Sequence, residues 1–282
     1  MNNIVEPVAR VLIKCLDHKG LVYNISKIFF DMGLNIETNQ EYVDKHSGWF
    51  FMRTVVSGNF EVDSLKSKLL LVLPDKAKIK ILFPTKKKIV LMVTKESHCL
   101  GDILTRELDS ALNAEVVAVI SNHTNLSELT QRFDLPFYHI DATALTRTEH
   151  ETKVIKQLDL LDFDYIILAK YMRILSETFV DKYKHKIINI HHSFLPSFIG
   201  ANPYNQAWER GVKLIGATAH FVTNELDEGP IIAQDVVVVS HRDTWKDMQN
   251  YGQDVEKIVL VRALKLVFAD KVFICNNKTI IL

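Results

Sequence analysis

The chain has 282 residues, of which 48% are hydrophobic and 24% charged, enough apolar material for one or two globular domains and too much for a disordered chain. Its 34 basic and 34 acidic residues balance, which disfavours a nucleic acid or an anionic membrane as partner. No apolar run approaches the ~20 residues of a membrane-spanning helix, and residues 1–10 carry no leader-like pattern. We therefore expect a cytoplasmic protein.

Glycine is scarce: the chain has ten, and none falls between residues 102 and 199. A dinucleotide fingerprint or a phosphate loop needs clustered glycines, so that backbone amides can approach the anion. The sequence therefore predicts no nucleotide cofactor. The three cysteines are isolated and not spaced as zinc ligands, which predicts buried thiols at Cys15, Cys99 and Cys275.

The first 84 residues predict a small, compact domain. Val8 to Cys15 is rich in β-formers, and the amphipathic helical pattern that follows ends at Gly33. The order β-α-β-β-α-β is that of the ferredoxin-like split unit. Its remaining elements are expected over residues 34–43, 49–56, 62–73 and 77–83.

Pro84 to Lys88, a proline before a solvated basic run, marks a boundary between a domain of residues 1–84 and one of residues 85–282. Beyond it, short buried β runs alternate with helices, which is typical of an α/β fold with a doubly wound, mostly parallel sheet. The expected strands cover residues 89–94, 115–121, 137–140, 164–169, 187–191, 217–222 and 231–239. The expected helices cover residues 101–111, 126–133, 149–158, 176–183 and 255–268, and a hairpin closes the chain.

Ligands of such sheets bind beyond the carboxyl ends of the strands. This rule places on one rim Ser97-His98, Asn122-His123, Lys170 to Arg173 and Asn189 to His192. The densest polar group is the last of these. Alternation along a strand puts Asn189 and His191 on one face and His192 on the other, so a carboxamide lies beside an imidazole.

Three strings point to a known family: Asn189-Ile190-His191 followed by Leu195-Pro196, Gly216 to Val222, and Leu226 to Ile232. Together they resemble the formyltransferase family that uses 10-formyltetrahydrofolate. Residues 191–216, with Gly200-Ala201 among them, resemble the branch in which water takes the formyl group. Residues 1–84 resemble the ACT domain that precedes the catalytic domain in that branch. The resemblance implies hydrolysis of 10-formyltetrahydrofolate to tetrahydrofolate and formate, which would supply formate for purine biosynthesis and balance one-carbon pools.

The catalytic trio that the resemblance implies is Asn189, His191 and Asp227. Cleaving a formamide requires a hydrogen-bond donor to the formyl oxygen, a proton for the departing nitrogen and an activated nucleophile. Asn189 can donate its amide N–H, and His191 can exchange a proton near neutral pH. Asp227 either orients that imidazole or holds and deprotonates the attacking water.

The folate-contacting loop implied by the resemblance is Lys170, Tyr171, Met172, Arg173, Ile174 and Leu175. Met172 and Leu175 would be apolar walls for the pterin, or else core residues at the start of a helix. The turn from Leu226 to Gly229 would close the other side. The folate is the substrate, and no cofactor or metal is implied.

Related transferases bind a phosphorylated amine at the first strand-to-helix turn, here Thr94 to Gly101. The first glycine of this turn comes late, and Glu96 would repel a phosphate. We therefore expect water as the acceptor, with transfer to an amine as the alternative. Ser97 and His98 would shape the water site, unless Ser97 only caps the helix.

Two other hypotheses remain. A metal hydrolase could use Asp227 with His192, His220 and His241, but adjacent strand histidines cannot both face one ion and no helix carries a His-x-x-x-His pair. A non-catalytic folate or amino-acid sensor would not need the whole trio.

The ACT resemblance implies a homo-oligomer, from dimer to hexamer, and an amino-acid effector. The effector turn would contain Asp17, Gly20 and Leu21, where Gly20 lets the backbone approach a carboxylate at a helix N-terminus. The family more often has a proline where this chain has Lys19, which weakens this part of the resemblance.

Overall fold

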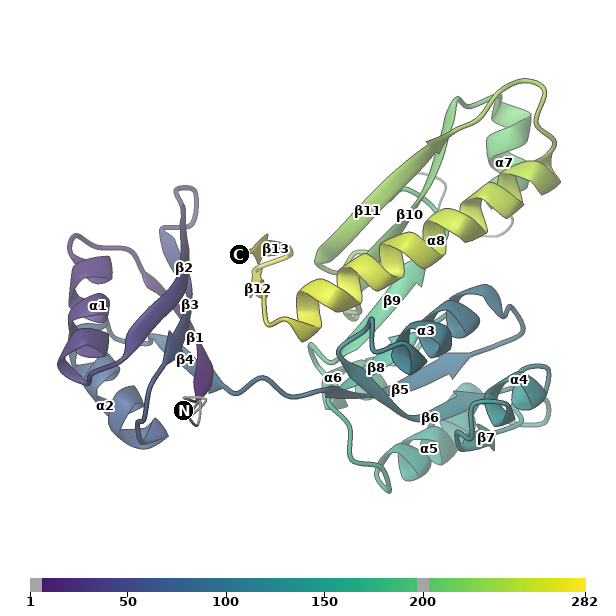
Figure 1. Cartoon of the computed structure of the whole chain (residues 1–282). Helices are drawn as coiled ribbons and strands as arrows, with labels where there is room; N and C mark the ends of the chain where they lie inside the picture. The colour runs from purple at the N-terminus through teal and green to yellow at the C-terminus, as the bar shows by residue number, and fades with distance from the viewer. Residues whose placement is uncertain (1–6, 197–202) are drawn as a thin grey trace. The chain divides into compact units, whose positions relative to one another are not determined.

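The computed structural model describes residues 7–196 and 203–282 (Figure 1). Gly200 and Ala201 of the quoted motif lie outside the described residues. The chain forms two compact units that divide between Thr85 and Lys86, and the N-terminal unit also contains residues 269–273 and 280–282. None of the described helices is both long enough and apolar enough to span a membrane.

The N-terminal unit is the ferredoxin-like split unit that the sequence predicted. Its antiparallel sheet has the order β2-β3-β1-β4, and two helices pack their apolar faces against it. The elements are β1 (Val8–Leu16), α1 (Leu21–Asp31), β2 (Asn35–Asp44), β3 (Trp49–Ser57), α2 (Val62–Val72) and β4 (Lys78–Leu82).

Two arginines of this sheet hold the segment that contains Ala269 and Asp270. Arg53 is buried and donates hydrogen bonds to the carbonyls of both residues, and Arg10 pairs with the Asp270 carboxylate at 2.8 Å. A buried guanidinium needs such partners. The sequence-based domain limits did not include this C-terminal segment in the N-terminal unit.

The C-terminal unit is built on a seven-stranded sheet of order β11-β10-β9-β8-β5-β6-β7. The five strands from β9 to β7 are parallel, and β10 and β11 add to the β9 edge in antiparallel fashion. The strands are β5 (Lys87–Val93), β6 (Ala114–Ser121), β7 (Phe137–His139), β8 (Tyr165–Leu168), β9 (Ile187–His191), β10 (Leu214–Phe221) and β11 (Ile231–Val238).

The helices of this unit complete the predicted α/β architecture. They are α3 (His98–Leu108), α4 (Ser127–Gln131), α5 (Arg147–Leu158), α6 (Glu177–Lys182), α7 (Pro203–Arg210) and α8 (Trp245–Phe268). Apolar residues of α5 and α6 pack on one face of the parallel strands, and α8 packs against α3, β10 and β11. The chain winds from β5 outward in both directions, so the sheet is doubly wound, as predicted.

Three helices differ from the sequence-based expectation. The α3 helix begins at His98 rather than Gly101, α7 was not expected, and α8 begins ten residues before Val255. The start of α8 is polar and contains Gly252, which hides the helical pattern. Thr244 and Asp247 cap this end by exchanging side-chain to backbone hydrogen bonds.

The last hairpin pairs β12 (Val272–Cys275) with β13 (Lys278–Ile281), as expected. Asn277 in its turn donates a hydrogen bond of 2.7 Å to the Glu228 carbonyl. Cys15, Cys99 and Cys275 are buried thiols that form no disulfide, which confirms the prediction for them.

Two glycines within helices allow a matched test of how α8 packs against Tyr204 of α7. A Cβ at Gly252 would lie 2.1 Å from the Tyr204 hydroxyl, whereas a Cβ at Gly101 would meet nothing within 4 Å. We expect Gly252→Ala to destabilise the protein by about 1–3 kcal/mol through overpacking. Gly101→Ala should be neutral or stabilise it by up to about 1 kcal/mol. Urea unfolding measures both, and equal effects would contradict the packing described for α8.

Candidate active site

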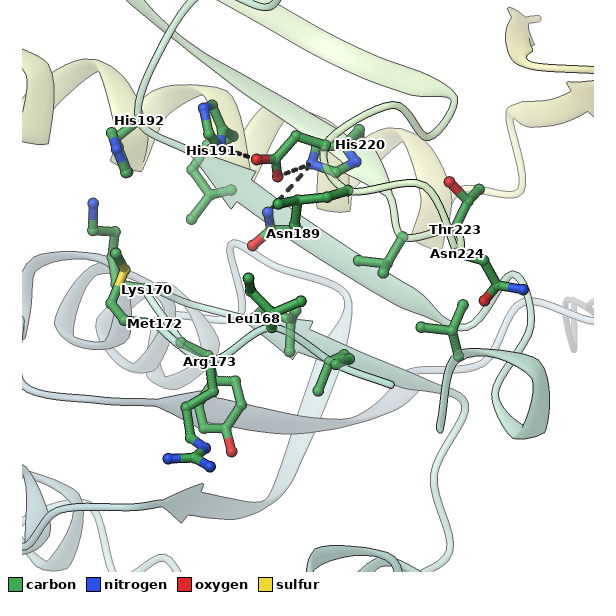
Figure 2. A pocket seen from close by; sticks show the side chains of 18 residues that line it. Leu168, Lys170, Met172, Arg173, Asn189, His191, His192, His220, Thr223 and Asn224 are labelled. Carbon is green, nitrogen blue, oxygen red and sulfur yellow. Dashed lines mark hydrogen bonds and ion pairs between the residues drawn. The ribbon is translucent and has the colours of Figure 1, made fainter. Parts of the chain in front are cut away.

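A pocket of about 330 Å³ opens in the C-terminal unit beyond the ends of β8 and β9 (Figure 2). Residues after β8, at the end of β9, and between β10 and β11 line it, and they include Asn189, His191 and Asp227. The structure thus brings the predicted trio together from places 38 residues apart along the chain. The volume suits a small ring system.

The imidazole of His191 is held by Asp227. Nδ1 of His191 lies 3.3 Å from Oδ2 of Asp227, and both side chains are largely buried. Burial alone would raise the pKa of Asp227, but the hydrogen bond and charge of His191 outweigh it, and the pKa is lowered. The carboxylate is therefore ionised near neutral pH, and it favours the His191 tautomer with the proton on Nδ1.

The other ring nitrogen of His191 is not held by the protein. Nε2 is buried and has no hydrogen-bond partner among the described residues. His191 is a lining residue of the pocket. A buried nitrogen without a partner is costly unless a ligand satisfies it.

The carboxamide of Asn189 is oriented by His220, which lies directly opposite it across the β9–β10 pair. Nδ1 of His220 donates to the Phe221 carbonyl at 3.0 Å, and burial lowers the pKa of this histidine. A neutral His220 therefore accepts at Nε2, where Nδ2 of Asn189 donates at 3.2 Å. The amide nitrogen of Asn189 carries a second N–H in addition to this one.

The turn that carries Asp227 is unusually tight. Asp227 itself has a φ of 58°, and a Cβ at Gly229 would lie 1.7 Å from the Phe221 carbonyl oxygen. Only glycine lets the turn approach β10 this closely. Gly229 therefore positions Asp227 and is not among the lining residues of the pocket, so its predicted contact with substrate stays a prediction.

The predicted folate loop, residues 170–175, lines the pocket over its whole length. Side chains from the residue after β5 and from α5 fix its backbone. Thr94 accepts from the Met172 amide at 2.9 Å, Arg147 donates to the Leu175 carbonyl, and Glu151 accepts from the amide of Ser176, just after the loop, at 2.7 Å. Such anchoring keeps a loop in one conformation without a ligand.

The loop and the Asp227 turn expose apolar side chains to the pocket. Met172 and Ile174 are each 58% exposed and Leu226 is 56% exposed. Leu175 is half-buried and packs against the core while also lining the pocket. Apolar groups left open to solvent around a pocket suit the face of a flat ring.

Behind Lys170 lies a buried ionic group that we call the Glu256 cluster: Glu256, Lys170, His98 and Tyr204. Glu256, on the buried face of α8, is fully buried. His98 and Tyr204 each contact its carboxylate at 2.6 Å, and Nζ of Lys170 lies 3.3 Å away. Burial would raise the pKa of Glu256, but the His98 hydrogen bond and the Lys170 charge lower it to about 2.

Among the described residues, His98, Cys99 and Glu256 are close enough together to hold a metal ion. Their chemistry disfavours it. Burial raises the pKa of the Cys99 thiol well above its usual value, so the thiol stays protonated. The Lys170 ammonium already neutralises the Glu256 carboxylate.

Some predicted side chains lie elsewhere than expected. Ser97 occupies the N-cap position of α3 without a side-chain cap hydrogen bond. His98 points to Glu256, and neither residue lines the pocket. The expectation that His192 points away from His191 is wrong, because β9 ends at His191 and the two rings stack 4.8 Å apart. Burial and the Lys170 charge lower the pKa of His192 to about 4.

At the predicted effector turn, Gly20 is the N-cap of α1 with a φ of 89°. Leu21 is buried and Asp17 is exposed. Effector binding there stays a prediction.

The sequence is similar to known proteins over its full length. Residues 87–264 match the model of the formyl transferase family. The chain belongs to this family. It is 50% identical over 283 residues to the formyltetrahydrofolate deformylase of Escherichia coli strain K12, covering 100% of both chains.

Two solved structures of family members are similar to this one. The first is a formyltetrahydrofolate deformylase from Pseudomonas syringae pv. tomato, with a TM-score of 0.94 and 39% identity, covering 100% of this chain and 96% of that one. The second is glycinamide ribonucleotide transformylase 1 from Symbiobacterium toebii, with a TM-score of 0.68 and 29% identity, covering 73% of this chain and 98% of that one.

The lowered pKa of Glu256 predicts an acid-sensitive contribution to stability. The folded state binds this proton only near pH 2, whereas the unfolded state binds it near 4.5. Stability from Glu256 is therefore fully present above about pH 5 and is lost as the pH falls from 4.5 toward 2. In urea unfolding, the advantage of the wild type over Glu256→Gln should shrink across this range.

Glu128→Gln is the control, since that side chain is 80% exposed. Its stability should stay within about 0.5 kcal/mol of the wild type at every pH. A gap between wild type and Glu256→Gln that stays constant down to acidic pH would contradict the charge assignment.

Proposed function

We propose that this chain hydrolyses 10-formyltetrahydrofolate to tetrahydrofolate and formate. The observation that carries the proposal is His191, a lining residue of the pocket whose Nδ1 is held by Asp227 and whose Nε2 has no partner among the described residues. The similarity to relatives named formyltetrahydrofolate deformylase over the full length supports the choice of substrate. Released formate would serve purine biosynthesis and balance one-carbon pools.

The proposed reaction begins at the formyl carbon. Asn189 donates its free amide N–H to the formyl oxygen, where negative charge develops as water attacks. Nε2 of His191 takes a proton from that water while the carbon–oxygen bond forms. Asp227 stabilises the resulting imidazolium, as the carboxylate of a Ser-His-Asp triad does.

The second half of the reaction breaks the carbon–nitrogen bond. The imidazolium of His191 returns the proton to the folate nitrogen, which leaves as a neutral amine. Formic acid leaves with both oxygens, one from the formyl group and one from water, and it loses the second proton of that water to the solvent to give formate. In this scheme Asp227 orients and stabilises His191 rather than acting as the base itself.

The pterin is proposed to bind between the loop of residues 170–175 and the Asp227 turn. Exposed apolar groups of both segments would cover the faces of the ring. Lys170, Tyr171 and Arg173 are proposed to contact the substrate through the same loop. No cofactor takes part in this scheme.

The proposal also covers where the protein acts, how it assembles and what regulates it. We expect a cytoplasmic homo-oligomer and an amino-acid effector at the turn of Asp17, Gly20 and Leu21. The left-handed Gly20 at the N-terminus of α1 supports a carboxylate at this position.

The test is formate release from 10-formyltetrahydrofolate by purified protein. Asp227→Asn keeps the shape of the side chain but removes the charge that stabilises the imidazolium. We expect kcat to fall by about 10³-fold or more with little change in KM. The matched control is Asp162→Asn, whose side chain is 87% exposed and which should release formate at the wild-type rate.

Wild-type protein that releases no formate would overturn the proposed function. Full activity in Asp227→Asn would overturn the role given to the carboxylate.

A further inference from the structure

The pocket has two different ends on either side of the reacting groups. Thr223 and Asn224 lie toward one end, and Lys170 and His192 face each other at the opposite end (Figure 2). A pterin bound beside Thr223 and Asn224 would present its formyl group to Asn189 and His191. An acceptor of that group would then approach from the Lys170 end.

Lys170 is fixed at this end by the Glu256 carboxylate, both oxygens of which already have partners. Its side chain is only 4% exposed, and its ammonium lies 3.3 Å from one oxygen of Glu256 and 3.4 Å from the other. His98 occupies the first of these oxygens and Tyr204 the second, each at 2.6 Å. No oxygen of Glu256 remains for an acceptor.

Moving Lys170 aside would carry a high cost. Withdrawing the ammonium leaves a fully buried carboxylate with less compensation, and breaking a buried ion pair by removing one partner is strongly destabilising. The backbone of Lys170 is also in the left-handed region, with a φ of 64°. A loosely held lysine would swing out into solvent, whereas this one forms a fixed wall.

We propose that the Lys170 side chain, locked by the Glu256 cluster, closes the acceptor end of the pocket to amines and leaves room for water only. This inference rests on the proposed function and names the residue that sets its acceptor. In the closed site, water adds to the formyl carbon, the carbon–nitrogen bond to folate breaks, and formate forms.

In an opened site, a primary amine replaces water. Its nitrogen bonds to the formyl carbon, the bond to the folate nitrogen breaks, and the amine proton passes to that nitrogen through His191. The products are an N-formyl amine and tetrahydrofolate, with no oxidant or other reactant needed.

The experiment compares two double variants with the wild type. Lys170→Ala/Glu256→Gln opens the end of the pocket, and Lys170→Met/Glu256→Gln keeps a side chain of similar length there. Because both remove the two opposite charges together, neither leaves an unpaired buried ion. Each protein receives 10-formyltetrahydrofolate with excess glycinamide at about pH 8.5, above the α-amino pKa of about 8.

The ratio of N-formylglycinamide to formate is the readout, and thermal melting checks that each variant folds. We expect this ratio to rise about tenfold or more in the opened variant only. The proposal is overturned if the folded opened variant keeps the wild-type ratio, or if it makes neither product, since Lys170 would then serve the reaction itself. An equal rise in the Lys170→Met variant also overturns it.

A measurement on the wild type alone keeps the proposal testable if the opened variant does not fold. Glycinamide should neither slow formate release nor yield N-formylglycinamide, and formation of that product by the wild type overturns the closure. Failure of the proposed function has a different signature, namely no formate from the wild type without amine.

Discussion

The hydrogen bond between His191 and Asp227 is the contact on which the chemistry of this pocket depends. It sets which ring nitrogen carries the proton, and it leaves Nε2, which has no partner among the described residues, as the nitrogen that takes the proton in the proposed reaction. In this contact Asp227 adopts a left-handed conformation, in a turn that packs tightly against β10. The turn can approach β10 this closely because Gly229 has no Cβ. The turn therefore does more than connect β10 and β11: it positions the carboxylate that contacts His191.

A second constraint is the charge buried at Glu256. One carboxylate on α8 gathers side chains from the start of α3, from α7 and from the loop after β8, so the helix serves as a fixed support for one end of the pocket. Burial of a charge is tolerated only because several donors surround it. Glu256 in turn holds Lys170 in place, and we propose that this fixed side chain selects the acceptor.

Sequence patterns predicted both sheets and placed Asn189 and His191 at the end of a strand, because alternating burial and the ends of parallel strands leave local signals. The trio with Asp227 was implied by the family resemblance and by no local pattern. The patterns missed α7 and the first ten residues of α8, where polar residues and Gly252 hide the periodicity. They also missed Glu256, although it lies in the apolar stripe with Val259 and Ala263, and a lone charge on such a face calls for a partner. The orienting role of His220 depends on the β9–β10 register, which no local pattern contains.

The most direct test of the account is nitrogen NMR of the histidine rings in the ligand-free protein with ¹⁵N-labelled histidine. Pairwise substitution assigns the signals of His191 and His220. The account predicts that the neutral form of each ring carries its proton on Nδ1, bound to Asp227 in one case and to the Phe221 carbonyl in the other. A neutral His191 protonated on Nε2 would contradict it, because Nε2 could then not accept the proton from water that the proposed reaction requires.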